Sequence, residues 1–365
     1  MILNLIKNLA KYTGIIIVVL FFFPLLPGFL VYRKYLRYRI SKNRNERLHD
    51  GINILESIEI GGIKQWISVR SENKNNPLLL ILHGGPGFSM MPYSFIFDSL
   101  EADFIIAQWD QRGTGKTYSI NKKILSSNSF TLEKMHSDTL EVVNYLRHRF
   151  QKDKIFVLGH SWGSVLGLKL AQDHPELLFS YIGAGQLINT KANEKTGYDN
   201  TLKIAYEKNH KKAIRSLEEL SSFHSNNLSF KELLVLRKWQ FHFNGILIKK
   251  LTMLSIIMRA LSAPEYSLLD YLNLIRGLSS LSKSKTMFTE ILNIALDDKT
   301  NISTAIFIFG GRKDPLTPSL PVYEYFEKIQ APCKEYIWFE NSGHNLFFEE
   351  PDKFLKSLRA VCKPS

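Results

Sequence analysis

Short apolar runs recur along most of the chain, separated by stretches with helix-like spacing. Six runs hold four to six residues each and most are bounded by Gly, Asp or Asn, as buried parallel strands are. They are Leu78–Leu82, Phe104–Trp109, Ile155–Leu158, Phe179–Ile182, Ala305–Phe309 and Tyr336–Phe339. Ahead of them, two apolar stretches flank Gly61-Gly62, which predicts a hairpin at a sheet edge.

The intervening stretches carry helix signals. Thr131 predicts a side-chain cap, a second helix is expected over about Trp162–His174, and a last one begins at Pro351. Alternation of strands and helices predicts an α/β fold with a mostly parallel, doubly wound sheet. We assign this core to residues 51–189 and 301–365.

Residues 190–300 break the alternation. Helix follows helix there, for example Leu233–Phe243 and Ile248–Leu261, with no strand-like run. An all-helical insert between two strands is expected to cover the site as a lid. We call residues 190–300 the cap and expect the substrate-binding residues to lie in it.

The N-terminal region has a third pattern. Residues 12–32 form a run of 21 uncharged residues, mostly Ile, Val, Leu and Phe, between Lys11 and Arg33. As a helix this run would span about 31 Å, close to the hydrocarbon thickness of a bilayer. The alternative is a cleaved signal peptide, which needs a shorter run and a small-residue cleavage site that is missing here. The run therefore predicts a transmembrane anchor, with the lipid bilayer as a partner.

Charge adds to this picture, whereas the overall composition is ordinary for a globular protein. Of the net charge of +13, residues 1–50 contribute nine Lys/Arg against two acids, and the cap seventeen against eleven. A basic stretch beside a membrane span favours lipid headgroups over nucleic acid, so we expect no nucleic-acid partner. Residues 33–50 are predicted as a basic juxtamembrane segment, with regular structure beginning near Ile52. Their positive charge favours a cytoplasmic catalytic domain.

The candidate nucleophile is Ser161. It is the centre of Gly159-His160-Ser161-Trp162-Gly163, which follows an apolar strand and opens a helix. This strand–turn–helix context is that of the G-x-S-x-G nucleophile elbow, whose glycines allow close backbone approach. The motif alone would also fit an ordinary turn, but its context favours a serine nucleophile.

A nucleophilic serine needs a base and an acid that orients it. Asp314 follows the run Ala305–Phe309, and His344 follows Tyr336–Phe339, so both are expected at carboxyl ends of parallel strands. In proteins with such a nucleophile elbow the serine is followed along the chain by the acid and then by the histidine, and these three residues have the same order. The predicted triad is Ser161, Asp314 and His344.

The oxyanion of an acyl-transfer reaction needs two hydrogen-bond donors. One should be the backbone N–H of Trp162, and the other should come from His83-Gly84-Gly85-Pro86-Gly87, with Gly85 the best candidate. Pro86 has no N–H to donate. The sequence has no P-loop ending and no zinc-type Cys/His spacing, so we expect neither cofactor nor metal.

These motifs together resemble the prolyl aminopeptidase (proline iminopeptidase) branch of the α/β-hydrolases. The resemblance rests on His83–Gly87, on Trp109-Asp110-Gln111-Arg112-Gly113 and on Gly159–Ser164, and covers roughly residues 55–190 and 300–365. It implies the same triad and oxyanion donors. Asp110 and Arg112 are expected to be structural, because neither is needed for acyl transfer.

The cap departs from the family pattern. Members that cleave an N-terminal proline hold the substrate's amine with cap carboxylates, usually near a Trp-Glu pair, whereas here Trp239 precedes Gln240. Five other cap glutamates could substitute: Glu207, Glu218, Glu219, Glu232 and Glu265. Three hypotheses follow: an aminopeptidase-like serine hydrolase acting on a small molecule or short peptide, a carboxylesterase or acyl hydrolase with the same triad, or a non-catalytic binding module.

The two cysteines bear on the compartment. Cys333 opens the last strand and Cys362 ends the last helix, which runs back towards the start of that strand. The expectation is therefore either a bridge, which would argue for an extracytoplasmic domain, or two unrelated thiols.

Overall fold

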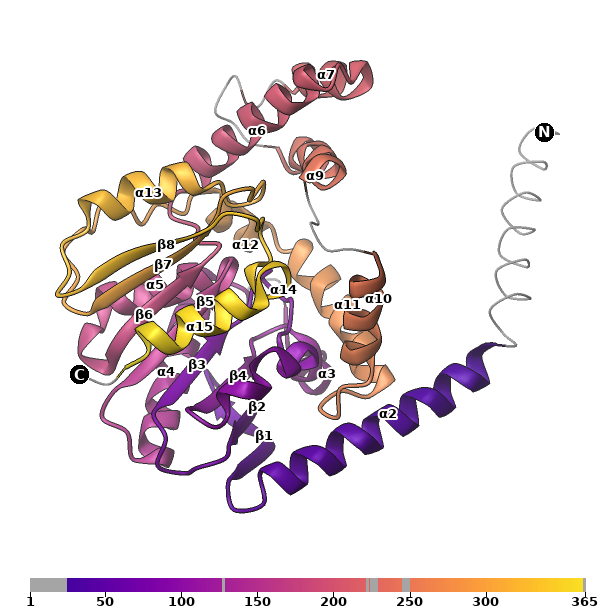
Figure 1. Ribbon diagram of the computed structural model, residues 1–365. Coiled ribbons are helices and arrows are strands. Elements are labelled where there is room, and N and C mark those ends of the chain that lie inside the picture. The colour runs from indigo at the N-terminus through magenta and orange to yellow at the C-terminus, as the bar shows by residue number, and fades with distance from the viewer. Residues whose placement is uncertain (1–24, 127–128, 221–222, 224–228, 245–249, 364–365) are drawn as a thin grey trace.

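The computed structural model describes residues 25–126, 129–220, 223, 229–244 and 250–363 (Figure 1). An eight-stranded sheet runs through it in the order β1-β2-β4-β3-β5-β6-β7-β8. The strands are β1 Ile52–Ile60, β2 Ile63–Ser71, β3 Leu78–Leu82, β4 Ile105–Asp110, β5 Ile155–His160, β6 Leu178–Ala184, β7 Ala305–Gly311 and β8 Lys334–Phe339. The predicted hairpin is β1–β2, antiparallel through Ile60 and Ile63, and β2 also pairs antiparallel with β4. The pairs from β4 to β8 are parallel, so the predicted α/β sheet is confirmed.

Helices cover both faces of the sheet because its strands are apolar on both sides. Leu78, Leu80 and Leu82 of β3 belong to one buried cluster, and Leu79 and Ile81 belong to the other, as the two-residue strand period requires. One cluster is covered by α4 (Leu132–Phe150), α5 (Trp162–Asp173) and α13 (Ser319–Lys328). The other is covered by η1 (Met91–Leu100), α14 (Leu346–Glu349) and α15 (Pro351–Val361). Thr131 caps α4 as predicted, because its side chain accepts from Lys134 N.

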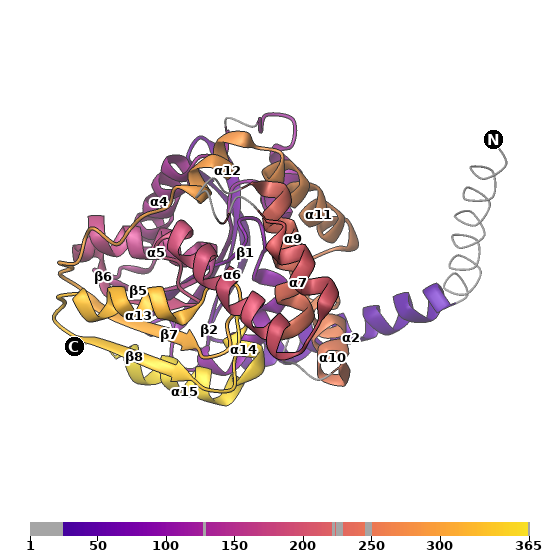
Figure 2. The ribbon, with the colours of Figure 1, turned by 90° about the horizontal axis from the view of Figure 1, so that it is seen from above.

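Between β6 and β7 the elements that the structure describes are helices, apart from isolated β-bridges at Asn189–Ala295 and at Asn301. The helices are α6 (Thr190–Glu207), α7 (Lys211–Glu218), α9 (Phe230–Asn244), α10 (Lys250–Leu261), α11 (Leu268–Ser282) and α12 (Lys285–Leu292). Helices α6, α7 and α9 surround a small apolar core of their own. Helix α11 packs beside α3 (Gly115–Asn121), and α10 and α11 lie on the side of the molecule from which α2 extends (Figure 2).

The N-terminal prediction needs a correction. Regular structure begins well before Ile52, because α2 spans Leu25–Arg47 and includes most of the predicted juxtamembrane segment 33–50. The helix shows no apolar period because arginine side chains make many of its contacts with the rest of the chain. Of the predicted anchor 12–32, residues 12–24 lie outside the described residues and the remainder begins α2. Among the residues that the structure covers, no helix is long and apolar enough to cross a membrane.

The two cysteines are free thiols. Cys333 is exposed and Cys362 is buried, and burial raises the pKa of the Cys362 thiol. The structure therefore contains two separate thiols and no bridge between them.

Candidate active site

Ser161 lies at the sharp turn between β5 and α5. Its backbone has φ 54° and ψ −119°, a conformation that a residue with a side chain rarely adopts. A Cβ atom on Gly159 would lie 2.5 Å from Gly163 O, and one on Gly163 would lie 2.1 Å from Leu82 O. Both glycines of the motif are therefore required by backbone contacts, and the Ser161 side chain is left half-buried.

Asp314 and His344 form a direct pair beyond the ends of β7 and β8. His344 Nδ1 donates to Asp314 Oδ2 over 2.9 Å, and both side chains are buried. Asp314 also accepts from Leu316 N at 2.8 Å, Thr317 N at 2.9 Å and Thr317 Oγ1 at 2.6 Å. Burial alone would raise the pKa of Asp314, but His344 and the Thr317 hydrogen bonds outweigh it, so the pKa lies below its usual value. An ionised carboxylate is thus held against the imidazole.

Two residues that the sequence analysis did not identify position His344. Gly185 follows β6 with φ 55°, and a Cβ atom there would lie 3.2 Å from His344 Nδ1. His160 Nε2 donates to the His344 carbonyl over 3.0 Å, and the two ring centroids are 5.0 Å apart. Burial lowers the pKa of His160 to about 3, so its ring is neutral. His344 therefore lies beside the residue that precedes Ser161, although within the described chain no hydrogen bond joins Ser161 to His344.

The glycine-rich loop after β3 runs against Ser161. A Cβ atom on Gly84 would lie 3.1 Å from Ser161 Cβ. Gly85 has φ 117°, a conformation that favours glycine, and a Cβ atom there would lie 2.6 Å from Gly87 N. The predicted donors Gly85 and Trp162 are the chain neighbours of Gly84 and Ser161, so both backbones approach the candidate nucleophile.

Gln111 links the glycine-rich loop after β3 to Trp162, and the sequence analysis gave it no role. Its backbone N–H donates to His83 Nε2 and its side-chain amide to His83 O, each over 3.2 Å. Its amide oxygen accepts from Trp162 Nε1 over 3.1 Å. Burial lowers the pKa of His83 to about 4, and His83 Nδ1 donates to Gly84 O over 2.9 Å. The signal was available, because Gln111 lies in the Asp-Gln-Arg-Gly motif.

Asp110 and Arg112 of the same motif make contacts of a structural kind. Arg112 forms a bidentate pair with Asp138, with both distances 2.9 Å. Asp110 accepts from Ser89 Oγ over 2.5 Å and from the hydroxyl of Tyr266 in the cap. Burial raises the pKa of Asp110 to about 6. Asp110 therefore connects the loop after Gly87 to the segment between α10 and α11.

Helices α6 and α9 of the cap contact the Asp314 loop. Gln240 donates to Pro315 O over 2.6 Å and accepts from Arg237 over 2.8 Å. Arg237 also pairs with Glu194 at 2.5 Å, and Glu194 is buried. The sequence analysis did not consider Glu194, which these contacts connect to the Asp314 loop through Arg237 and Gln240.

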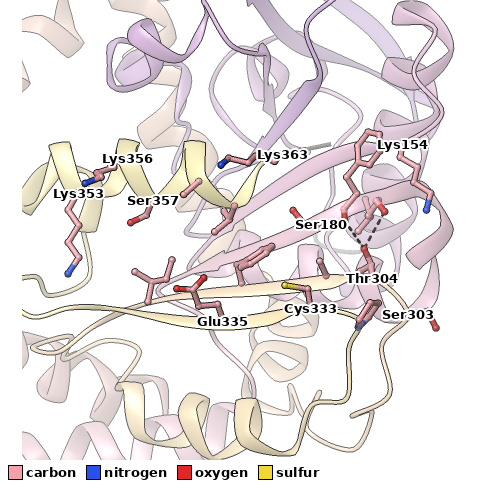
Figure 3. Close-up of a pocket in the computed structure, with 18 residues that line it drawn as sticks. Lys154, Ser180, Ser303, Thr304, Cys333, Glu335, Lys353, Lys356, Ser357 and Lys363 are labelled. Atoms are coloured by element: carbon pink, nitrogen blue, oxygen red, sulfur yellow. Dashed lines mark hydrogen bonds between the residues drawn. The ribbon is translucent and has the colours of Figure 1, made fainter. Parts of the chain in front are cut away.

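The candidate site is separate from a hollow of about 870 Å³ at the other end of the sheet (Figure 3). The hollow is lined by the starts of β6, β7 and β8, including Ser180, Thr304 and Cys333. Ser161, Asp314 and His344 instead follow the carboxyl ends of strands. In the part of the chain that the structure covers, no group of three or more His, Cys, Asp or Glu side chains is placed to hold a metal ion.

Comparison with known proteins agrees with the fold. The sequence model of the alpha/beta hydrolase fold family matches residues 77–351. The "Probable aminopeptidase YbaC" of Bacillus subtilis is 30% identical over 309 residues, 84% of this chain and 95% of that protein. The proline iminopeptidase of Heyndrickxia coagulans is 24% identical over 304 residues, 82% of this chain and 94% of that one. The crystal structure of the Mycobacterium smegmatis proline iminopeptidase superposes with a TM-score of 0.60 at 15% identity, covering 84% of this chain and 97% of that one.

Proposed function

We propose that this chain, which belongs to the α/β-hydrolase family and to its prolyl aminopeptidase-like branch, is a serine hydrolase that cleaves an amide or ester bond through an acyl-enzyme. The observation that carries the proposal is the Asp314–His344 hydrogen bond of 2.9 Å, formed beside the turn that presents Ser161. Relatives named as a probable aminopeptidase and as a proline iminopeptidase favour an amide substrate.

In the proposed reaction, Ser161 Oγ attacks the carbonyl carbon while His344 Nε2 takes its proton. Asp314 keeps Nδ1 protonated and stabilises the imidazolium that forms. The carbonyl oxygen becomes an oxyanion that accepts from the N–H groups of Gly85 and Trp162. His344 then gives its proton to the leaving amine or alkoxide, and the C–N or C–O bond breaks. Water repeats the sequence, leaving a carboxylic acid and free Ser161.

The replacement Ser161→Ala tests this mechanism. It should reduce turnover of an aminoacyl-arylamide or acyl ester by several orders of magnitude while leaving the unfolding midpoint nearly unchanged. Ser357→Ala, in α15 beside the distant hollow, is the matched control and should keep full activity. Undiminished turnover by the Ser161→Ala protein would exclude Ser161 as nucleophile.

A carboxylesterase or acyl hydrolase is the second candidate, favoured by the charges of the cap. The family's amine-binding carboxylate is replaced by Gln240, and Glu194 is paired with Arg237. Because Arg237 already compensates the charge of Glu194, this carboxylate should bind a substrate ammonium group weakly. Blocking the N-terminus of a peptide substrate should therefore change its hydrolysis little. A hundredfold preference for the free amine, or about 2.7 kcal/mol, would restore the aminopeptidase assignment.

Membrane attachment through residues 12–32, with the catalytic domain in the cytoplasm, remains part of the proposal. It is supported by the uncharged run and by the seven Lys/Arg between residues 33 and 47. The protein should stay with membranes after alkaline washing, and its domain should resist protease added to intact cells. Digestion of the domain by protease added to intact cells would show that the catalytic domain lies outside the cytoplasm.

A further inference from the structure

The first charged side chain after the uncharged run contacts the cap. Arg33 Nε donates to Leu261 O over 2.7 Å, and its Nη2 donates to Tyr266 O over 3.0 Å. One turn later, Arg37 donates to Pro264 O over 3.0 Å. The connection between α10 and α11 is therefore held beside the residue at which the predicted anchor ends.

Both helices that meet at this connection expose apolar side chains. On α11, Leu268, Leu269, Leu272 and Ile275 are 38–64% exposed. The opposite face of the same helix is buried: Asn273 bonds to Ser119, and a Cβ atom on Gly277 would lie 2.2 Å from Gly113 O. On α10, Leu254 is 58% and Ile257 is 44% exposed.

Helix α2, which contacts α10, also exposes apolar and aromatic side chains. Val31 is 70% exposed, and Tyr32, Tyr35 and Tyr38 are 51–65% exposed. Tyrosine is enriched where a protein meets the boundary between lipid and water, because its ring is apolar and its hydroxyl is polar. Large apolar patches on a protein surface often mark a site of interaction with another protein or a membrane.

We propose that the exposed faces of α10 and α11 lie in the interface of the lipid bilayer, beside the N-terminal anchor. The uncharged run ends at Arg33, and Arg33 contacts the α10–α11 connection, so an inserted anchor brings these helices to the headgroup level. Exposed Arg276, Lys283 and Lys285 at the end of α11 and beyond it provide positive charge for anionic headgroups.

This docking has a consequence for the substrate. The buried side of α11 ends at Leu278 and Leu281, and a Cβ atom on Gly87 would lie 2.6 Å from Leu281 Cδ1. One helix thus separates the bilayer from the loop proposed to hold the oxyanion. The inference rests on the proposed anchor and not on the serine mechanism, and it favours acyl substrates that partition into membranes.

The test uses the full chain in vesicles of phosphatidylcholine and phosphatidylglycerol, in a Cys333→Ser background. A polarity-sensitive fluorophore is attached at Ile275→Cys, and at Lys328→Cys on exposed α13 as the matched control. Lipids carrying a nitroxide on the acyl chain should quench the probe at 275 several-fold more than the probe at 328. A third probe, at Val19→Cys, reports insertion of the anchor separately.

Equal, weak quenching at 275 and 328 with strong quenching at 19 would overturn the docking of the cap and keep the anchor. Weak quenching at all three positions would refute both the proposed anchor and the proposed docking of the cap. A third outcome is a probe at 275 that is shielded from water, is not quenched by nitroxide lipids, and quenches itself as the protein concentration rises. This result would assign the surface to a second copy of the chain, and it would also refute the proposal.

Discussion

The Asp314–His344 pair and the junction of α2 with the rest of the chain both bury charge, but they stabilise it differently. The contacts of Asp314 come from its own loop and from His344. At the junction, the buried charges come from four separate segments: Arg44, Arg70, Glu101 and Glu265. Arg44 lies 2.7 Å from Glu265, and Arg70 lies 2.9 Å from Glu101.

The difference shows in the ionisation of the carboxylates. Hydrogen bonds and His344 keep the pKa of Asp314 low despite burial, whereas burial raises the pKa of Glu101 even with Arg70 and Arg47 beside it. Glu265 Oε2 has no hydrogen-bond partner among the described residues. Asp314 is therefore stabilised by its own loop and by His344, while the junction depends on α2 being in place.

The largest effect should come from Asp314→Asn. The amide cannot stabilise an imidazolium and favours the wrong tautomer of His344, so the turnover rate should fall by roughly 10³–10⁴. The unfolding midpoint should change little, because the local hydrogen bonds of the loop are largely kept. Loss of folding together with activity would mean that Asp314 is chiefly structural.

Next in size is Arg70→Met at the junction. Removing a fully buried cation leaves Glu101 and Glu265 undercompensated, at a cost of about 3–5 kcal/mol in the free energy of unfolding. Urea unfolding followed by circular dichroism measures this cost. Arg149→Met, which breaks a more exposed pair with Glu56, should cost about 0–1 kcal/mol. Equal costs for the two variants would show that the junction contributes no more than a surface pair.

A third effect concerns pH. Burial raises the pKa of Asp110 from 3.8 to about 6, so between these values the folded protein keeps a proton that the unfolded chain has lost. Its contribution to stability is therefore complete below about pH 4 and declines as the pH rises to about 6. Asp110→Asn should remove this part of the decline, on the order of 1–3 kcal/mol. An unchanged slope of unfolding free energy against pH would place the Asp110 pKa near its ordinary value.

The smallest effect should come from Thr317→Val. It removes the hydroxyl that donates to Asp314 Oδ2, one hydrogen bond worth about 1 kcal/mol or slightly more. The value of kcat should fall by roughly tenfold with KM nearly unchanged. A rise in KM alone would indicate that Thr317 contacts the substrate instead.

The sequence predicted those features that depend on local pattern. The six apolar runs are strands, and the glycines around Ser161 are required by backbone contacts. The structure of residues 33–47 was missed because Arg33 and Arg37 contact distant carbonyl groups, which leave no periodic signal in the sequence. Gln111 and Gly185 were missed because their roles depend on which loops meet at the ends of the strands. Thr317 lies three residues from Asp314, but nothing in its sequence pattern shows that its hydroxyl contacts the Asp314–His344 pair.

The central claim is that Ser161 is the nucleophile, and covalent labelling tests it most directly. The full-length protein is treated with a fluorophosphonate, digested, and its peptides are analysed by mass spectrometry. We predict a single adduct on Ser161, strongly reduced in the Asp314→Asn protein because the serine is no longer activated. An adduct on another residue, or none on Ser161 in protein that hydrolyses its substrate, would contradict the account.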